Sequence, residues 1–405
     1  MTSASEISGL SISPRQAAGC KVFLGSSVPR VNCDLDNSGT INRVYYDASA
    51  QTEQPSEFFT QGLVDIQVNG FAGIDFNNPG LTAAQMDHAL THLAASGVTC
   101  VLPTLITTTE TEFINRLEAL DKAVSDSDLG PLMVPGYHIE GPFLSPTDGC
   151  AGAHPASAMR PGSRQLITDL QAVSSRPILV VTVAPEQDGV LDLIPFLTKQ
   201  GISCAIGHTA ASRTEIKAAI AAGATLSTHL GNGLPHNLNK NENPLFSQLG
   251  EDALTASFIV DGIHIHPQSL QTYFRAKTIA RSIIVTDAVA AAGAHLPPGF
   301  YTIGETKIQR HEDGTVRIPG SQYLAGSSVT MDQMVRNLMD WYGFSMDAIL
   351  LLARDNPAQV VGDFTGDLAI GSNANLVNWR NENGALRVID CLLYTSDAAD
   401  DLRGV

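Results

Sequence analysis

Five polar residues that could carry hydrolytic chemistry each follow a short apolar run of the sequence. They are Glu140, His208, His229, His264 and Asp287. One carboxylate and two imidazoles, from Glu140, His208 and His229, are a donor set typical of a catalytic divalent metal with positions left open for water and substrate. Asp287 would then act as the general base that takes a proton from the attacking water.

Each of these residues, taken alone, also has a structural explanation. A single histidine at the end of a strand is more often a hydrogen-bonded structural residue than a metal ligand. The set is a different matter, because packing gives no reason to place carboxylates and imidazoles at the ends of several strands of one barrel. We therefore interpret the five residues together as a functional site.

The elements that must position these residues read as repeated βα units. From residue 62 to about 360, β-branched runs alternate with segments of helical period, which predicts a parallel sheet. Eight runs are predicted strands: 64–68, 98–102, 132–138, 178–183, 203–206, 224–228, 256–260 and 283–286. Predicted helices include 82–96, 110–125, 212–222, 267–277, 331–341 and 346–354. Eight parallel strands close an α/β fold of the (β/α)₈ TIM-barrel type, with the active site at their carboxyl ends.

The flanks of the chain differ from the barrel at residues 62–362. Residues 1–61 and 363–390 show weak alternation and are predicted to form a small β-sandwich from both chain ends. Residues 391–405 match neither pattern, and we expect a non-native or disordered tail there.

Composition excludes several classes of partner. Lys and Arg number 24 against 41 Asp and Glu, for a net charge of −17, so binding to nucleic acid is disfavoured. No apolar run approaches the roughly 18 residues of a membrane span, and the start lacks the pattern of a signal peptide. The six scattered cysteines fit a reducing compartment. We expect a cytoplasmic protein without nucleic-acid or membrane partners.

Several ordered segments resemble the N-acetylglucosamine-6-phosphate deacetylase family of the metal-dependent amidohydrolases. The matching segments are 64–70, 138–144, 152–154, 184–186, 207–208, 228–230, 261–264, 286–288 and 324–327. The resemblance implies a (β/α)₈ barrel with a small β-sandwich, usually in a homodimer. It also implies hydrolysis of the acetamide of a phosphorylated amino sugar, N-acetylglucosamine 6-phosphate, to glucosamine 6-phosphate and acetate.

The resemblance also assigns residues. Glu140, His208 and His229 correspond to the metal ligands, and Asp287 corresponds to the catalytic acid and base. The residues that correspond to substrate contacts are Ala153, His154, Asn232, Gly233, His264, Leu324, Ala325 and Gly326.

Two departures from the family pattern bear on the metal and the phosphate. Many amidohydrolases begin the barrel with an H-x-H that holds a second metal, whereas this chain has Gln67-Val68-Asn69, and amides are poor ligands for divalent metals. A single metal follows, with zinc as the first expectation and iron, cobalt or manganese as alternatives. After His229, Gly231 and Gly233 replace bulkier residues, and Lys240 stands where relatives have an Arg, so Lys240 would hold the phosphate as a point charge.

Two rival functions stay open at this stage. One is a related amidohydrolase that deacetylates another N-acetylated sugar or an amino acid. The other is a catalytically silent barrel that serves as a scaffold or sensor.

Overall fold

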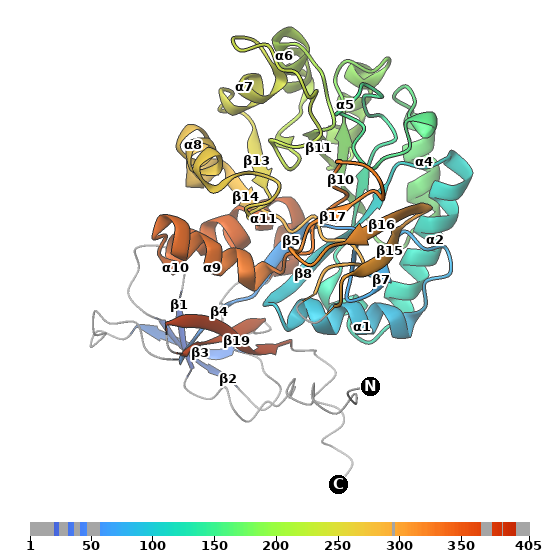
Figure 1. The fold of residues 1–405 in the computed structure, drawn as a ribbon. Coiled ribbons are helices and arrows are strands. Elements are labelled where there is room, and N and C mark those ends of the chain that lie inside the picture. Colours follow the sequence, from blue (N-terminus) through green and yellow to red (C-terminus); the bar gives the residue numbers. More distant parts are fainter. Residues whose placement is uncertain are drawn as a thin grey trace.

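The computed structural model describes residues 20–23, 31–35, 41–46, 57–293, 296–365, 375–382 and 384–393. Eight strands form one parallel sheet with neighbours in the order β14-β13-β12-β11-β10-β9-β8-β5, and helices surround it (Figure 1). The strands are β5 (Leu63–Val68), β8 (Val98–Ile106), β9 (Tyr137–Glu140), β10 (Ile178–Val183), β11 (Ser203–Ile206), β12 (Leu226–Ser227), β13 (Thr255–Phe258) and β14 (Ser282–Ile284). The predicted (β/α)₈ barrel is confirmed.

The barrel closes between β5 and β14 without a regular ladder. The backbone N–H of Asp287 donates to the carbonyl of Gln67 at 3.0 Å, and Val68 forms an isolated parallel bridge with Ala288. These contacts lie just beyond the carboxyl end of β14. The seam of the barrel therefore coincides with the position of Asp287.

Helices cover the outside of the sheet, and each follows a strand or a loop. The helices of the βα units are α1 (Ala83–Ala94), α2 (Glu110–Asp126), α3 (Gly130–Met133), α4 (Arg164–Val173), α5 (Val190–Lys199), α6 (Arg213–Ala222), α7 (Pro244–Leu249) and α8 (Pro267–Lys277). Thr82 and Ser212 cap α1 and α6 through capping boxes, as their sequence positions predict. The chain then continues through α9 (Met331–Tyr342), α10 (Met346–Leu350), a π-helical turn (Leu351–Asp355) and α11 (Asn356–Val361).

One predicted strand is partly wrong. Residues 132–138 were expected to be extended, but Pro131 opens the short helix α3, and β9 begins only at Tyr137. Proline suits the first helical turn because its missing N–H would be unpaired there. The prediction of a helix over 346–354 is correct up to Leu350, after which the coil widens into the π-helical turn.

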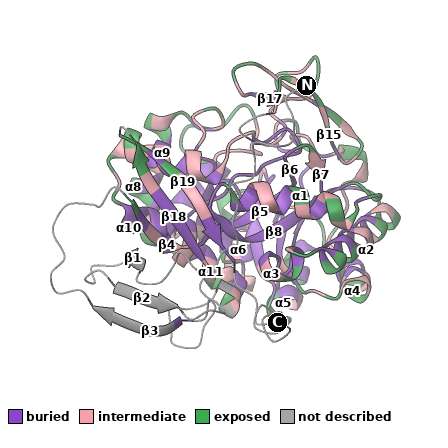
Figure 2. Cartoon of the chain, turned by 90° about the horizontal axis from the view of Figure 1, so that it is seen from below, coloured by how far each residue is buried: buried purple, intermediate pink, exposed green. Residues whose placement is uncertain are grey.

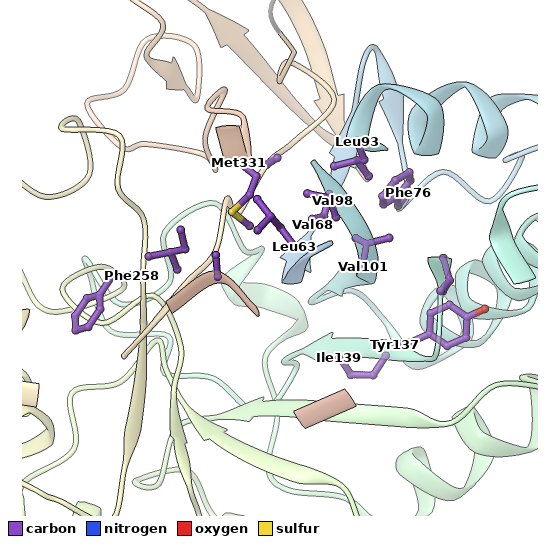
Figure 3. Close-up of a cluster of buried hydrophobic side chains, with 14 of the residues drawn as sticks. Leu63, Val68, Phe76, Leu93, Val98, Val101, Tyr137, Ile139, Phe258 and Met331 are labelled. Carbon is purple, nitrogen blue, oxygen red and sulfur yellow. The ribbon is translucent and has the colours of Figure 1, made fainter. Parts of the chain in front are cut away.

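Both faces of the barrel sheet are buried, which explains its continuous apolar runs. One cluster includes Val64, Cys100 and Val180 and draws almost entirely on strand residues, as expected for the inside of a barrel. A second cluster joins Val98 and Val101 to apolar residues of the surrounding helices. Figure 2 shows the buried strands enclosed by half-exposed helices, and Figure 3 shows part of the second cluster.

Strands from both ends of the chain meet in a second sheet below the barrel (Figure 1). It has six strands in the order β19-β18-β4-β1-β2-β3, with β18 pairing antiparallel to β4. They are β1 (Cys20–Phe23), β2 (Val31–Leu35), β3 (Ile41–Tyr46), β4 (Glu57–Gln61), β18 (Leu376–Glu382) and β19 (Ala385–Leu392). The β-sandwich was predicted to be built from both chain ends, and the two ends do meet in one small β domain, whose described strands form a single six-stranded sheet.

The boundary expected at residue 390 is wrong by a few residues. Cys391 and Leu392 belong to β19, pair with Val377 and Leu376, and are buried, so the ladder satisfies their backbone groups. The rest of the expected tail, from 394 onward, lies outside the described residues. No helix among the described residues is long and apolar enough to cross a membrane.

A further small sheet follows β14. It comprises β15 (Gly299–Ile303), β16 (Thr306–Arg310) and β17 (Val316–Arg317), and a two-stranded ribbon is formed by β6 (Gly70–Phe71) and β7 (Ile74–Asp75). The buried carboxylate of Asp75, in β7, accepts hydrogen bonds from Thr302 and Gly304. These bonds connect the β15–β17 sheet to the β6–β7 ribbon. Ile303 is thereby held at the carboxyl end of the barrel.

Candidate active site

Three predicted metal-ligating atoms converge at the carboxyl end of the barrel. Glu140 is the last residue of β9, and His208 and His229 lie two residues beyond β11 and β12. Glu140 Oε1 is 3.1 Å from His208 Nε2 and 3.0 Å from His229 Nε2, and the two nitrogens are 3.0 Å apart. Ligands of a tetrahedral zinc with bonds near 2.0 Å lie roughly 3.3 Å apart. These three residues, the donor cluster below, are spaced closely enough to share one cation.

The hydrogen bonds around the donor cluster fix which atoms are free to bind. His208 Nδ1 lies 2.7 Å from the backbone carbonyl of Cys150, which can only accept, so this nitrogen carries the proton. In the neutral ring, His208 Nε2 therefore presents a lone pair to the cluster. Gln67 Nε2 donates to Glu140 Oε1 at 2.9 Å and orients that carboxylate.

The charges within the donor cluster support one another. Burial raises the pKa of Glu140, but its contacts with the rings of His208 and His229, which stabilise the carboxylate when these rings are protonated, outweigh burial and hold this pKa well below its usual range. Burial opposes a charge on His229, yet its contact with Glu140 raises its pKa. The site is thus arranged to keep an anion next to a positive charge.

His154 lies beside the donor cluster but differs from it in tautomer. Its Nε2 is 3.8 Å from Glu140, and Glu140, His154 and His208 also form a group whose donor atoms lie within 4.8 Å of one another. His154 Nδ1 accepts from the backbone N–H of Thr107 at 3.3 Å and lies 2.9 Å from the Thr107 hydroxyl. Burial lowers the pKa of His154 to about 3, so the ring is neutral and its single proton is on Nε2. His154 therefore offers a donor rather than a lone pair to the cavity.

Asp287 lies three residues beyond β14, at the seam of the barrel. Asn69 Nδ2 donates to Asp287 Oδ1 at 2.8 Å. Burial raises the pKa of Asp287 to about 6, and the charge of Glu140 raises it further while that of His229 opposes. A carboxylate with this pKa can both take and return a proton near neutral pH.

The backbone at three of these residues is strained. Among the described residues, His208, His229 and Asp287 have φ values of 50°, 29° and 47°, in the left-handed region that side chains disfavour. Such conformations cost about 1–3 kcal/mol each and persist where the surrounding structure imposes them, often at functional sites. The sharp turn after each strand directs these side chains into the mouth of the barrel.

One cavity of about 450 Å³ brings together most of the residues that the sequence singled out. The predicted residues that line it are Glu140, Ala153, His154, His208, His229, Asn232, Gly233, His264, Asp287, Leu324 and Gly326. A larger cavity of about 930 Å³, bordered by α1, α9 and β19, contains none of them. The convergence of donors, not cavity size, therefore identifies the candidate site.

Two predicted contact residues lie elsewhere. Ala325 is fully buried and donates its backbone N–H to Val316, and Lys240 is exposed outside the lining of the cavity. No Lys or Arg is found among the described residues that line the cavity.

The loops after β12 and β13 shape the wall of the cavity. A Cβ on Gly233, at φ 59°, would lie 2.9 Å from His208 Nδ1, so only glycine fits against that ring. His264 Nδ1 is 2.6 Å from Asp261 Oδ2, and Asp261 also accepts from the backbone N–H of His264 at 2.9 Å. Asp261 thus fixes the ring of His264 at the edge of the cavity.

A second group of side chains lies at the outer edge of the cavity. The hydroxyl of Tyr323 donates to Asp148, His236 Nε2 lies 3.1 Å from the same hydroxyl, and the His236 and Tyr323 rings stack with centroids 5.3 Å apart. Asp148 and His236 are exposed. We refer to these three residues as the rim cluster.

Sequence reasoning missed the roles of Gln67 and Asn69. It treated them only as residues that cannot replace two metal-binding histidines, whereas they hydrogen-bond to Glu140 and Asp287. Gln67 lies in β5 and Asn69 directly follows it, and their spacing of two at the end of this strand was the available signal.

The chain is similar to known proteins over most of its length. The model of the amidohydrolase family matches residues 58–392. The chain is 30% identical over 360 residues to an N-acetylglucosamine-6-phosphate deacetylase of Bacillus subtilis, covering 84% of this chain and 87% of that protein. It is also 30% identical over 328 residues to an N-acetylgalactosamine-6-phosphate deacetylase of Escherichia coli, covering 80% and 84%.

A solved structure is similar over nearly the whole chain. It is an N-acetyl-D-glucosamine-6-phosphate deacetylase of Mycobacterium smegmatis in complex with N-acetyl-D-glucosamine 6-phosphate. The TM-score is 0.81 at 26% identity, with 92% of this chain and all of that chain covered.

Proposed function

We propose, from the premise that this chain belongs to the amidohydrolase family, that it hydrolyses the acetamide of N-acetylglucosamine 6-phosphate. The products are glucosamine 6-phosphate and acetate. The observation that carries the proposal is the convergence of Glu140, His208 and His229 beside Asp287 in one buried cavity. Relatives with that activity span most of the chain.

We propose that Glu140, His208 and His229 hold one divalent metal ion, with zinc as the first candidate. The lone pair that His208 presents and the short separations within the donor cluster support this set. His154 is excluded from the set because its Nε2 carries the proton. When bound, such an ion supplies Lewis-acid polarisation of the acetamide carbonyl and makes water more acidic.

Asp287 performs the proton transfers. It takes a proton from the attacking water, whose oxygen bonds to the carbonyl carbon, and returns that proton to the departing nitrogen as the C–N bond breaks. Its burial and its raised pKa suit both steps. The Nε2–H of His154 faces the same space and is suited to donate to the carbonyl oxygen.

The sugar ring occupies the wider part of the cavity. His264, fixed by Asp261, and the Asn232–Gly233 loop line this part and provide polar contacts for hydroxyl groups. Leu324 and Gly326 line it as well, while Ala325 supports their loop from its buried position.

The phosphate requires a cation from outside the described lining of the cavity. We keep Lys240 as the phosphate contact and propose that it reaches the ligand across the interface of a homodimer. The absence of Lys and Arg among the described lining residues supports this arrangement.

The cytoplasmic location stays a prediction.

N-acetylgalactosamine 6-phosphate is the second candidate substrate, because a relative with that activity is equally similar in sequence. A substrate panel separates the possibilities. Acetate release is measured from both phosphorylated sugars, from unphosphorylated N-acetylglucosamine and from an N-acetylated amino acid. The proposal predicts the highest kcat/KM with N-acetylglucosamine 6-phosphate. No release from any of them by the zinc-loaded protein would support the silent scaffold instead.

A further inference from the structure

Asn69 combines a fixed donor with an unpaired acceptor beside the general base. It directly follows β5, is only 2% exposed and lines the small cavity. Its Nδ2 donates to Asp287 Oδ1 at 2.8 Å. Its Oδ1 is buried and has no hydrogen-bond partner within the described part of the chain.

The orientation of this amide follows from the chemistry of its neighbour. An ionised carboxylate can only accept, so the NH₂ end of Asn69 must face Asp287, and the oxygen must point away from it. A buried acceptor without a partner destabilises a folded protein, and such groups are rare unless a ligand or water completes them. The unpaired Oδ1 therefore indicates that a donor belongs at this place in the cavity.

The reaction brings two donors near Asp287, the second O–H of the attacking water and the N–H of the scissile acetamide, and only the N–H is missing from an ester substrate. Asp287 must come within hydrogen-bond distance of the scissile nitrogen in order to protonate it, and this nitrogen carries one N–H in the acetamide. The carbonyl oxygen has no proton to give and instead needs donors such as His154 Nε2–H. Sugar hydroxyls are one bond or more further from the bond that breaks.

We propose that Asn69 is a further catalytic residue whose Oδ1 accepts the N–H of the scissile acetamide while its Nδ2 holds Asp287. This inference rests on the proposed function. With its hydrogen directed at Asn69, the nitrogen presents its developing lone pair toward Asp287. The proton taken from water then moves to nitrogen, the C–N electron pair stays on nitrogen, and the amine leaves while the acid product loses its proton to solvent.

Gln67 shows why the assignment is specific to Asn69. Gln67 lies two residues earlier on the same face and donates to Glu140, a residue of the donor cluster. The two amides occupy the positions of the H-x-H pattern named above. One orients a proposed metal ligand, and the other orients the proposed general base. Of these two amides, only that of Asn69 hydrogen-bonds to the residue proposed to deliver a proton to the scissile nitrogen.

The test compares Asn69→Leu with wild type on two substrates that differ in one atom. One is N-acetylglucosamine 6-phosphate, and the other is the 2-O-acetyl ester of glucose 6-phosphate, which has no N–H. We expect kcat for the amide to fall on the order of 10²-fold and kcat for the ester to fall on the order of tenfold, since both substrates need an oriented Asp287. Where the ester binds without being cleaved, its inhibition constant is measured instead and is expected to rise less in Asn69→Leu than the KM of the amide does.

Controls separate catalysis from folding. Asn356→Leu removes a buried asparagine whose Nδ2 also makes two short hydrogen bonds, to Ile279 and Ser282, far from the cavity lining. It is expected to lower Tm and to keep kcat. Asn69→Ala serves if Asn69→Leu does not fold, and bound zinc and Tm are measured for every variant.

Three outcomes decide the matter. A larger loss for the amide than for the ester supports the proposal. Equal losses for both substrates overturn the N–H contact, and unchanged kcat for both overturns any role in catalysis. Wild-type protein that cleaves neither phosphorylated sugar contradicts the proposed function itself, which is a distinct result.

Discussion

The donor cluster lies in the small cavity and the rim cluster lies at its outer edge, and the two are built in opposite ways. Glu140, His208 and His229 are almost fully buried, and backbone or side-chain hydrogen bonds outside the cluster fix Glu140 and His208. In the rim cluster, by contrast, Asp148 and His236 are exposed, and both hydrogen-bond to the hydroxyl of Tyr323. The difference teaches that the groups proposed to break the bond are desolvated and fixed, whereas the groups at the edge of the cavity are open to solvent.

Substitution of Asp287, the proposed general base, gives the largest expected effect among the buried residues of the cavity. Asp287→Asn keeps the shape of the side chain but cannot accept a proton, so kcat is expected to fall on the order of 10³-fold. Acetate release at saturating substrate measures the loss, and zinc analysis checks that the donor cluster is intact. Retention of more than a tenth of the wild-type rate would remove Asp287 from the mechanism.

A change that touches the donor cluster only through packing gives the next effect. In Gly233→Ala the new Cβ would lie 2.9 Å from His208 Nδ1 and displace the ring. Zinc affinity is expected to fall about 10- to 100-fold, as for other changes that disturb ligand orientation. Gly343→Ala is the matched control, because Gly343 has a similar φ of 65° and nothing lies within 4 Å of its added Cβ. Equal zinc affinities for the two variants would contradict the packing argument.

The pH profile tests the electrostatics of the buried end. Burial raises the pKa of Asp287 from its ordinary value to about 6, so the unprotonated base is lost as the pH falls through 6. We expect kcat/KM to fall about tenfold per pH unit below that point at constant zinc saturation. An acid limb that begins near pH 4 would mean that Asp287 is not buried as described, or is not the base.

We expect substitution of an exposed residue near the edge of the cavity to change the kinetic constants only weakly. Lys240→Ala is expected to raise KM for the phosphorylated sugar about fivefold, because an exposed ion pair contributes little free energy, and to leave kcat unchanged. Unphosphorylated N-acetylglucosamine is the substrate control, and Lys199→Ala, at an exposed lysine in the last turn of α5, is the protein control. An equal rise in KM with both sugars would separate Lys240 from the phosphate.

The barrel could be predicted because each of its strands is a run of neighbouring residues with one shared property, burial on both faces. Strands buried on both faces must be continuously apolar, and this pattern located 178–183 and 203–206 with the bounds that the structure has. Features set by tertiary contacts were less accessible. Strands β15 to β17 are short and half exposed, and Asp75, far away in the sequence, anchors the β15–β16 turn.

The candidate site likewise has a part that local sequence patterns predicted and a part that depends on tertiary contacts. Polar residues at the ends of apolar strands were visible in the sequence, and the cavity gathers Glu140, His208, His229 and Asp287. The tautomer of His154 and the partners of Asn69 depend on contacts between residues more than 40 positions apart, which no local pattern encodes. The predicted contact at Ala325 rested on its neighbours in a motif, and its own side chain faces the core.

We propose that the buried donor cluster and Asp287 together hydrolyse an acetamide. Acetate release from N-acetylglucosamine 6-phosphate by chelator-treated protein, with and without added zinc, tests this directly. We expect little release after chelation and full recovery when zinc is restored, with Asp287→Asn nearly inactive in both states. Undiminished release from the metal-free protein, or none from the zinc-loaded protein, would contradict it.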